Sequence, residues 1–250
     1  MKLSNKIALI TGASAGIGKA CAEVFAEAGA KLILIARRED KLKEVTENIF
    51  KNFGTEIYSI ICDITNYEEL KNYIDTLPEK WSNIDILINN AGKARGLNKI
   101  QDGNLDDWNE MIDTNIKGLL YVSKLIIPKM IIQNNGHIIN IGSIAGREVY
   151  PNGNVYCSTK AAVSSLSKAM VIDLNGTGIK VTNIEPGLVE TEFSIVRFHG
   201  DINSAKKVYQ GYTPLTGKDI AETALFVASR PKHVMIQDIL IPNYAIENNF

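Results

Sequence analysis

The chain has 250 residues, of which 45% are hydrophobic and 22% are charged, and its 27 basic and 28 acidic side chains leave a formal net charge of −1. This length and balance fit one globular domain of the α/β class. Because the charges are scattered and nearly equal, they exclude any electrostatic reason to expect a nucleic acid or an acidic membrane as partner.

Neither the cysteines nor the histidines have the spacing of a metal site. Cys21, Cys62 and Cys157 lie far apart and form no Cys-x-x-Cys pair, so they predict neither a zinc site nor a disulfide framework. The 3 histidines do not match H-E-x-x-H. We predict no metal, and reduced thiols in a reducing compartment.

Two apolar runs could suggest a targeting or membrane segment, but both are too short. Residues 6–10 give about five apolar residues, fewer than the 7–15 of a signal-peptide core. Residues 119–132 are interrupted by Lys124, Pro128 and Lys129 and fall short of the ~20 apolar residues that span a bilayer. We therefore predict a buried helix there, no membrane partner and a cytoplasmic protein.

Short apolar, β-branched runs alternate along the chain with longer stretches of helical spacing, as at residues 17–28, 39–53 and 67–77. This alternation predicts right-handed βαβ units and a parallel sheet. Because the strands are apolar almost throughout, we expect helices on both faces, in one doubly wound domain over residues 1–250. The seven predicted strands are residues 6–10, 31–36, 56–62, 84–89, 136–142, 179–185 and 238–242.

A glycine-rich turn, TGASAGIGKA, follows the first predicted strand and opens a helix. Gly12, Gly16 and Gly18 let the backbone approach a pyrophosphate, and the helix N-terminus offers it unpaired N–H groups. A purely structural tight turn is the alternative. The position between a strand and an amphipathic helix favours a dinucleotide site.

The second predicted strand ends at Arg37 and Arg38, where NAD-binding units place an acidic residue for the ribose 2′-hydroxyl. Guanidinium groups bind a 2′-phosphate through charge-assisted hydrogen bonds, whereas a carboxylate would repel it. We therefore predict NADP(H) as the cofactor, with Ser14 as a further donor. Two solvated surface arginines are the alternative.

Tyr156 and Lys160 are four residues apart in the helical stretch NVYCSTKAAV. Residues at this spacing share one helix face, ~5–6 Å apart at Cβ. A phenol has a pKa near 10, and a positive neighbour favours the phenolate. The two side chains are therefore either surface residues or an acid–base pair.

Residues 187–217 contain no clear strand, although strands and helices alternate elsewhere. An insertion between a late strand and the last helix is typical of a substrate lid, which we predict at about residues 188–216. The alternative is a surface excursion without chemical importance.

Further motifs follow one another along the chain: CDIT, NNAG, DTNIKG, INIGSIAG, YCSTK and EPGLVETEF. With the glycine turn, and in this order, they resemble the short-chain dehydrogenase/reductase family over essentially the whole chain. The resemblance implies a Rossmann-type fold and an oxidoreductase. It implies that Tyr156 is the general acid/base and that Lys160 supplies charge beside it and binds the nicotinamide ribose. Ser143 would hold the substrate oxygen, and Asn115 would link the lysine to a water.

The resemblance also implies contacts to the cofactor at the C-terminal ends of the strands, where open α/β sheets bind ligands. One pair resembles the adenine contacts, one turn lies beside the ribose, and the segment after the sixth strand meets the nicotinamide carboxamide. The implied cofactor-binding residues are Gly12, Ser14, Gly16, Ile17, Gly18, Arg37, Arg38, Asp63, Ile64, Asn90, Gly92, Tyr156, Lys160, Pro186, Gly187, Val189 and Thr191.

Within the family, PNGNVYCSTKA and IEPGLVETEFSIVRFHGD resemble the NADP-dependent 3-hydroxy acid dehydrogenases. The implied substrates are L-serine, L-allo-threonine, 3-hydroxyisobutyrate and 3-hydroxypropionate. Arg95 stands where this branch usually has an apolar residue. A substrate carboxylate needs a cation, and we expect Arg197 in the lid as its anchor, or else Arg147, although both could equally form surface ion pairs. The expected substrate-binding residues are Ser143, Arg147, Tyr156, Phe193 and Arg197.

Two other functions fit the pattern less well. Reduction of 3-oxoacyl groups on a carrier protein would favour a basic docking patch, and a silent NADPH-binding sensor would not need the complete catalytic set. The resemblance also implies a homotetramer, in which small and apolar residues at 161–174 could pack against a second copy. The alternative is that this face packs on the domain's own sheet.

Overall fold

The structure is a computed structural model that describes residues 2–211 and 213–244. The predicted domain over residues 1–250 therefore includes residues 1, 212 and 245–250, which lie outside the described part, and residue 212 falls within the predicted lid.

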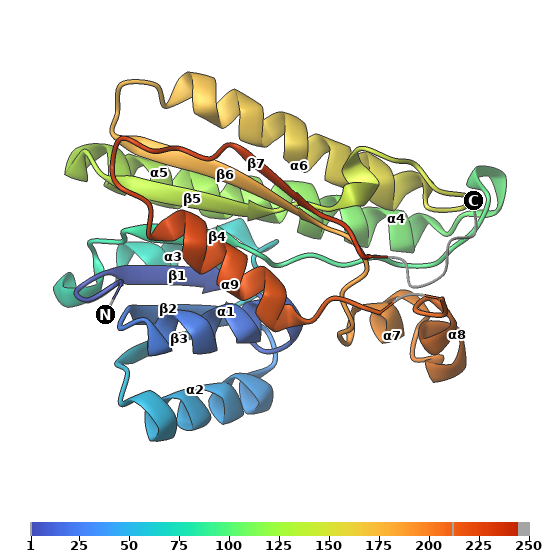
Figure 1. Ribbon diagram of the computed structural model, residues 1–250, viewed down its shortest axis with the longest axis horizontal. Coiled ribbons are helices and arrows are strands. Elements are labelled where there is room, and N and C mark those ends of the chain that lie inside the picture. The colour runs from blue at the N-terminus through green and yellow to red at the C-terminus, as the bar shows by residue number, and fades with distance from the viewer. Residues whose placement is uncertain (1, 212, 245–250) are drawn as a thin grey trace.

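Seven parallel strands form one sheet in the order β3-β2-β1-β4-β5-β6-β7 (Figure 1). The chain runs outward from β1 to β3, returns to β4 on the other side of β1, and continues outward to β7. Such a reversal creates the crevice where open α/β sheets bind ligands. The strands are β1 (Ile7–Thr11), β2 (Lys31–Ala36), β3 (Ile57–Ile61), β4 (Ile86–Asn89), β5 (Gly136–Ile141), β6 (Ile179–Pro186) and β7 (Asp238–Ile241).

Helices cover both faces of the sheet because alternate strand residues point to opposite sides. Leu9 and Ile33 are fully buried on the face covered by α3 (Tyr67–Asp75), α5 (Leu119–Gln133) and α6 (Asn154–Asp173). Ile10 and Leu34 are fully buried on the other face, beneath α1 (Gly16–Glu27), α2 (Glu39–Phe53) and α9 (Gly217–Ala228). Each such side chain contributes about 1.5–3 kcal/mol by burial. The predicted doubly wound fold is confirmed.

The helical stretch that contains Asn115 is not a regular α-helix throughout. A π-helical turn, Asp113–Gly118, joins α4 (Leu105–Ile112) to α5. Such turns interrupt the regular hydrogen bonding of a helix and occur often at functional sites. Here the turn buries Asn115, which is only 2% exposed, against residues of two other segments.

The segment between β6 and α9 lies beyond the C-terminal ends of the strands (Figure 1). It contains two short helices, α7 (Phe193–Arg197) and α8 (Ile202–Lys207), and a single bridge between Val189 and Leu215. The segment ends at a capping box, in which Thr216 and Asp219 bond each other's backbone N–H groups at 2.7 and 3.3 Å. We call residues 188–216 the lid segment.

α5 contains residues 119–132, the apolar run that most resembled a membrane span in the sequence. Leu119, Val122 and Ile126 are buried in the core, whereas Ile132 is 86% exposed, so only one side of the helix is buried. Within residues 2–211 and 213–244, no helix combines the length and the apolar character that crossing a bilayer requires.

Candidate active site

The glycine-rich turn between β1 and α1 brings three strands' ends together. Gly12 has φ +66°, a backbone conformation that favours glycine. A Cβ on Gly18 would lie 2.3 Å from the Gly12 carbonyl oxygen, so a side chain there would break the turn. No side chain caps the N-terminus of α1. Its first N–H groups therefore remain available to an anion, as a pyrophosphate site requires.

An open pocket of about 400 Å³ extends from the tip of β2, across the glycine turn, to the start of α6. Its walls include 18 of the residues that the sequence predicted for cofactor or substrate, and its length and polar ends suit a dinucleotide with a small second ligand. These residues are Gly12, Ser14, Gly16, Ile17, Arg37, Arg38, Asp63, Ile64, Asn90, Gly92, Ser143, Tyr156, Lys160, Pro186, Gly187, Val189, Thr191 and Phe193. Gly18, Asn115, Arg147 and Arg197 are not in the walls.

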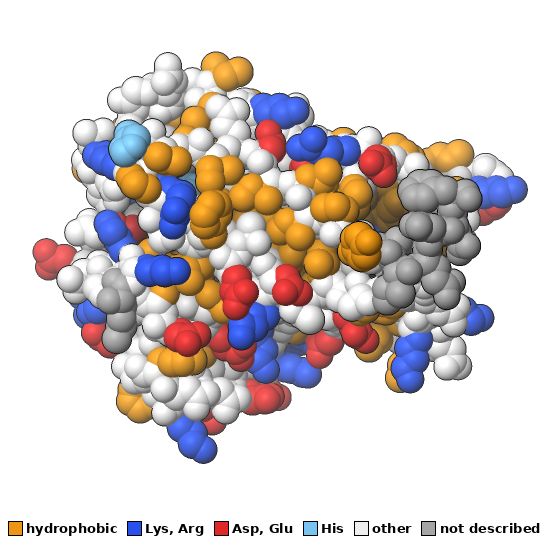
Figure 2. Space-filling view, in the orientation of Figure 1, with side chains coloured by type: hydrophobic (Ala, Val, Ile, Leu, Met, Phe, Trp, Pro, Cys, Tyr) orange, Lys and Arg blue, Asp and Glu red, His pale blue; other side chains and the backbone are white. Residues whose placement is uncertain are grey.

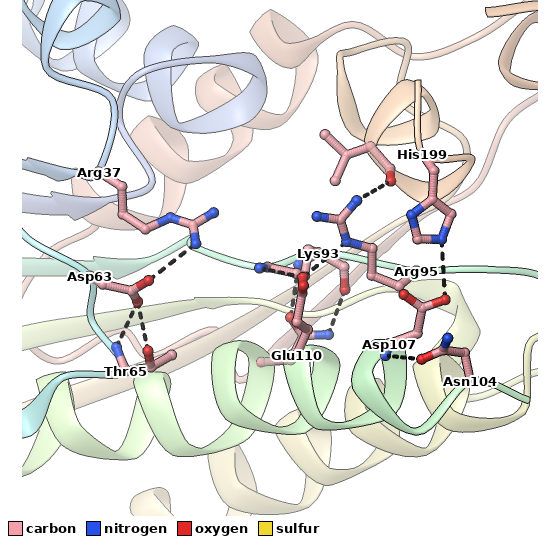
Figure 3. Close-up of polar contacts among 11 residues, drawn as sticks. Arg37, Asp63, Thr65, Lys93, Arg95, Asn104, Asp107, Glu110 and His199 are labelled. Carbon is pink, nitrogen blue, oxygen red and sulfur yellow. Dashed lines mark hydrogen bonds and ion pairs between the residues drawn. The ribbon is translucent and has the colours of Figure 1, made fainter. Parts of the chain in front are cut away.

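Cations gather at the β2 end of the pocket. Arg38 donates to the Ser14 Oγ at 3.3 and 3.4 Å. Arg37 donates to the Asp63 carboxylate at 3.1 Å, and Asp63 also accepts from the Thr65 N–H and hydroxyl (Figure 3). Partial burial acts to raise the pKa of Asp63, but these hydrogen bonds outweigh it and hold the pKa below its usual value. Asp63 is therefore ionised and fixed.

Tyr156 lies in the first turn of α6, with Lys160 one turn further along the same helix. Lys160 is buried, and its Nζ donates to the Ile141 carbonyl oxygen at 2.8 Å. Burial lowers the pKa of Lys160 to about 8, which leaves the amine mostly charged at neutral pH. Burial raises the pKa of Tyr156, while the Arg197 charge and a hydrogen bond with Ser143 act in the opposite direction.

Ser143 follows the end of β5 and faces the same pocket as Tyr156. Its Oγ accepts from the Ala145 N–H at 3.1 Å and lies 3.4 Å from the Pro186 carbonyl oxygen. These contacts orient a hydroxyl group beside the phenol. A substrate oxygen at this position would meet two hydroxyl groups.

Asn115 is held by hydrogen bonds to the backbone N–H and carbonyl groups of Lys93. Its Oδ1 accepts from the Lys93 N–H and its Nδ2 donates to the Lys93 carbonyl oxygen, both at 2.8 Å. Nδ2 also donates to the Thr159 hydroxyl at 3.0 Å. A Cβ on Gly92 would lie 3.3 Å from Asn115 Oδ1 and 3.6 Å from Lys160 Nζ. Gly92 thus lies between the asparagine and the lysine and leaves that space open.

Arg197 is a buried cation in an aromatic enclosure. Its guanidinium carbon lies 4.9 Å from the Tyr156 ring centroid, 5.4 Å from that of Phe193 and 5.6 Å from that of Tyr150. Nη2 donates to the Tyr150 hydroxyl at 2.6 Å, whereas the buried Nε has no hydrogen-bond partner. Within the described chain no carboxylate pairs with this charge, which is costly in a buried site.

Arg147, the other expected anchor, points toward two carboxylates outside the pocket, those of Glu185 and Asp238. Its Nε donates to Glu185, which is fully buried, and its Nη2 lies 4.0 Å from Asp238. Glu185 also accepts from the Ser164 hydroxyl. Because Arg147 already compensates the buried carboxylate of Glu185, whereas Arg197 lies beside the Tyr156 ring, the structure favours Arg197 as the anchor.

Ion pairs hold the loop after β4 against α4, and a hydrogen bond joins that loop to the lid segment. Lys93 and Arg95 both contact the Glu110 carboxylate at 3.0 Å, and these bonds keep the pKa of Glu110 low (Figure 3). Arg95 Nη1 also donates to the carbonyl oxygen of Val196 in α7 at 2.9 Å. No sequence pattern indicated Glu110, because it is one of several acidic residues in a polar helix.

The remaining titratable groups do not form a second centre. His137 lies buried on β5, with its Nε2 2.8 Å from the Thr182 hydroxyl. The cysteines are unpaired and buried. In residues 2–211 and 213–244 no three His, Cys, Asp or Glu side chains form a group that could hold a metal ion.

The structure combines a doubly wound sheet with an uncapped helix after a glycine turn. The half-buried Tyr156 and the buried Lys160 lie at the opposite end of the same pocket. Together these features define a dinucleotide-dependent oxidoreductase. The family profile described as short chain dehydrogenase matches residues 6–200. This chain belongs to that family, as its motifs predicted.

Relatives and solved structures agree with this assignment. An NADP-dependent 3-hydroxy acid dehydrogenase of Schizosaccharomyces pombe is 43% identical over 241 residues, which are 96% of this chain and 93% of the relative. The NADP-dependent 3-hydroxy acid dehydrogenase YdfG of Escherichia coli (strain K12) is 44% identical over 234 residues, 93% of each chain. The closed form of serine dehydrogenase complexed with NADP+ matches with a TM-score of 0.90 and 43% identity, over 94% of each chain.

Proposed function

We propose that this chain is an NADP(H)-dependent oxidoreductase that acts on the C3 hydroxyl or keto group of small 3-hydroxy acids. The class includes L-serine, L-allo-threonine, 3-hydroxyisobutyrate and 3-hydroxypropionate. The observation that supports it most directly is Arg197, a buried cation without a carboxylate partner in the described chain, beside the Tyr156 ring. A substrate carboxylate would supply the missing anion.

The coenzyme proposal rests on the β2 end of the pocket. Ser14, Arg37 and Arg38 offer a hydroxyl and two guanidinium groups there, which suit a phosphate better than a bare ribose hydroxyl. The names of the S. pombe and E. coli relatives contain NADP. When bound, the coenzyme supplies or accepts the hydride at the substrate carbon.

The chain's own residues manage the proton and the substrate oxygen. Tyr156 takes the hydroxyl proton when the alcohol is oxidised and returns it in the reduction. Lys160 and Arg197 stabilise the phenolate by their charge. Ser143 holds the substrate oxygen beside the phenol.

Charge at the substrate end favours acids without an amino group. The cations that line this end of the two pockets are Lys93, Arg95, Lys160 and Arg197, of which Lys93 and Arg95 are paired with Glu110. Among the described wall residues of the main pocket the carboxylates are Asp63 and Glu192, and both are already ion-paired. The ammonium group of serine would therefore meet the charges of Lys160 and Arg197 and no unpaired carboxylate among these wall residues. We propose that 3-hydroxypropionate and 3-hydroxyisobutyrate are the better substrates.

We also propose a homotetramer in the cytoplasm. The described cysteines are all unpaired, as in a reducing compartment. Ile172 on α6 is 74% exposed, and the edge strand β7 and α9 expose Leu240 and Phe226. Figure 2 shows apolar side chains gathered over β7 and its neighbourhood. Exposed apolar area of this kind fits burial between copies of the chain.

The test is NADPH formation, followed by absorbance, with the four acids and a neutral 3-hydroxy ester. We expect activity on the acids and little on the ester. Activity that favours the ester would support a reductase of carrier-bound 3-oxoacyl groups, and tight NADPH binding without turnover on any substrate would support a sensor.

A further inference from the structure

The lid segment has a carboxylate at the end of the pocket where the cations gather. Glu192 accepts from Arg38 Nη1 at 2.7 Å and from Lys41 Nζ at 3.1 Å. The three side chains are 41–49% exposed. This contact joins the lid segment to the tip of β2 and the first turn of α2, across the mouth of the pocket.

Both guanidinium groups at this end already have acidic partners. Arg37 is paired with Asp63, which is fixed by two further hydrogen bonds from Thr65. In contrast, the Glu192 carboxylate contacts only Arg38 and Lys41 among the described residues. Hydrogen bonds from these cations keep the pKa of Glu192 low, so its charge is present at neutral pH. Glu192 is therefore the partner that can be displaced more easily.

A 2′-phosphate at Ser14 and Arg38 would compete with Glu192. A phosphate monoester has a charge of about −1.5 to −2 at pH 7, and it would need the same two cations. Like charges close together repel, and a coenzyme without the phosphate would not meet this repulsion. The repulsion from Glu192 therefore opposes the binding of NADP(H) and not that of NAD(H).

We infer that Glu192 is a coenzyme-specificity residue, whose carboxylate pairs with Arg38 and Lys41 until a 2′-phosphate replaces it there. It weakens the binding of NADP(H) and leaves that of NAD(H) unchanged. The substrate side of the lid segment keeps its own contacts, since the Gly96 N–H donates to the Arg197 carbonyl oxygen at 2.9 Å and His199 lies 3.2 Å from Asp107 (Figure 3). Release of Glu192 from Arg38 and Lys41 therefore loosens the lid segment only at its coenzyme end.

The test compares Glu192→Gln with Glu190→Gln. The first variant removes the charge and keeps the shape. The second removes the same charge from an exposed lid residue that makes no ion pair within the described chain. Dissociation constants of NADPH and NADH are measured by protein fluorescence at low and at 1 M salt, with thermal melting as the folding control. No substrate is needed.

Because Glu192 forms two exposed ion pairs and each such pair is weak, we expect Glu192→Gln to bind NADPH about threefold to tenfold more tightly. NADH binding should change less than twofold, Glu190→Gln should match the wild type, and 1 M salt should remove the difference. Unchanged or weaker NADPH binding by Glu192→Gln overturns the inference. The inference rests on the proposed coenzyme, and equal affinities of the wild type for NADPH and NADH would instead overturn that proposal.

Discussion

Arg197→Met is the substitution that most directly tests the proposed substrate. Methionine has a similar length and can fill the space between the rings of Tyr150, Tyr156 and Phe193, so the enclosure stays packed. Only the charge and its hydrogen-bond donors are lost. Alanine would leave a cavity there and confuse packing with recognition.

The expected magnitude follows from the donors that Arg197 can offer. A charge-assisted hydrogen bond contributes about 1.5–3 kcal/mol, and a guanidinium can form two to one carboxylate. The loss of two such bonds, about 3–6 kcal/mol, corresponds to about 10²–10⁴-fold in kcat/KM. We expect most of it in KM, because the carboxylate interaction is present before and during the reaction.

The assay measures kcat and KM for 3-hydroxypropionate and for its methyl ester, with NADP+ saturating. The ester has no carboxylate, so Arg197→Met should affect it only through the lost charge beside Tyr156, which we expect to lower kcat less than tenfold and to leave KM nearly unchanged. Tyr150→Phe is the matched control, since it removes one hydroxyl contact of Arg197 and keeps the ring and the cation. An equal loss on acid and ester, or an unchanged KM for the acid, would refute the assignment of Arg197 as anchor.

Three further results are expected. Tyr156→Phe should lower kcat by at least about 10²–10⁴-fold with an unchanged Kd for NADPH, and near-normal turnover would contradict a proton-transfer role. In competition assays 3-hydroxypropionate should exceed L-serine at least about tenfold in kcat/KM, whereas a preference for serine would argue against the charge argument. Burial lowers the pKa of His137 to about 3 from an unfolded value of 6.5, so its contribution to stability is complete above pH 6.5 and is lost as the pH falls toward 3. Between pH 7 and 5, the wild type should therefore lose about 2 kcal/mol of unfolding free energy more than His137→Gln, as measured by urea titration.

Most of the fold could be predicted because the inner strands are buried on both faces and therefore read as continuous apolar runs. The glycine turn and the pair Tyr156 and Lys160 could be found for a similar reason, since both depend on spacing within one short segment. The predicted fold, family and oxidoreductase class are confirmed. The predicted roles of individual residues stay predictions.

Contacts between distant segments could not be predicted from such spacing. Arg147 and Arg197 are both isolated arginines in the sequence, and only the fold distinguishes them. Arg147 meets the buried carboxylate of Glu185, 38 residues away, whereas Arg197 meets the Tyr150 hydroxyl, 47 residues away. The strand containing Glu185 gave no indication that a charge is buried within it.

The π-helical turn Asp113–Gly118 positions Asn115, although a regular helix could join α4 to α5 without it. A helix advances about 100° per residue, so deleting one residue, such as Ile116, could restore a regular helix between α4 and α5 at small cost to the core. The same deletion would rotate neighbouring side chains by roughly that angle and remove the amide of Asn115 from Lys93 and Thr159. Under the role that the family resemblance implies for Asn115, an irregularity of one residue would matter little for stability and much for the reaction. Natural variation in the length of this helix would then be expected to mark chains that keep the architecture and have lost the reaction.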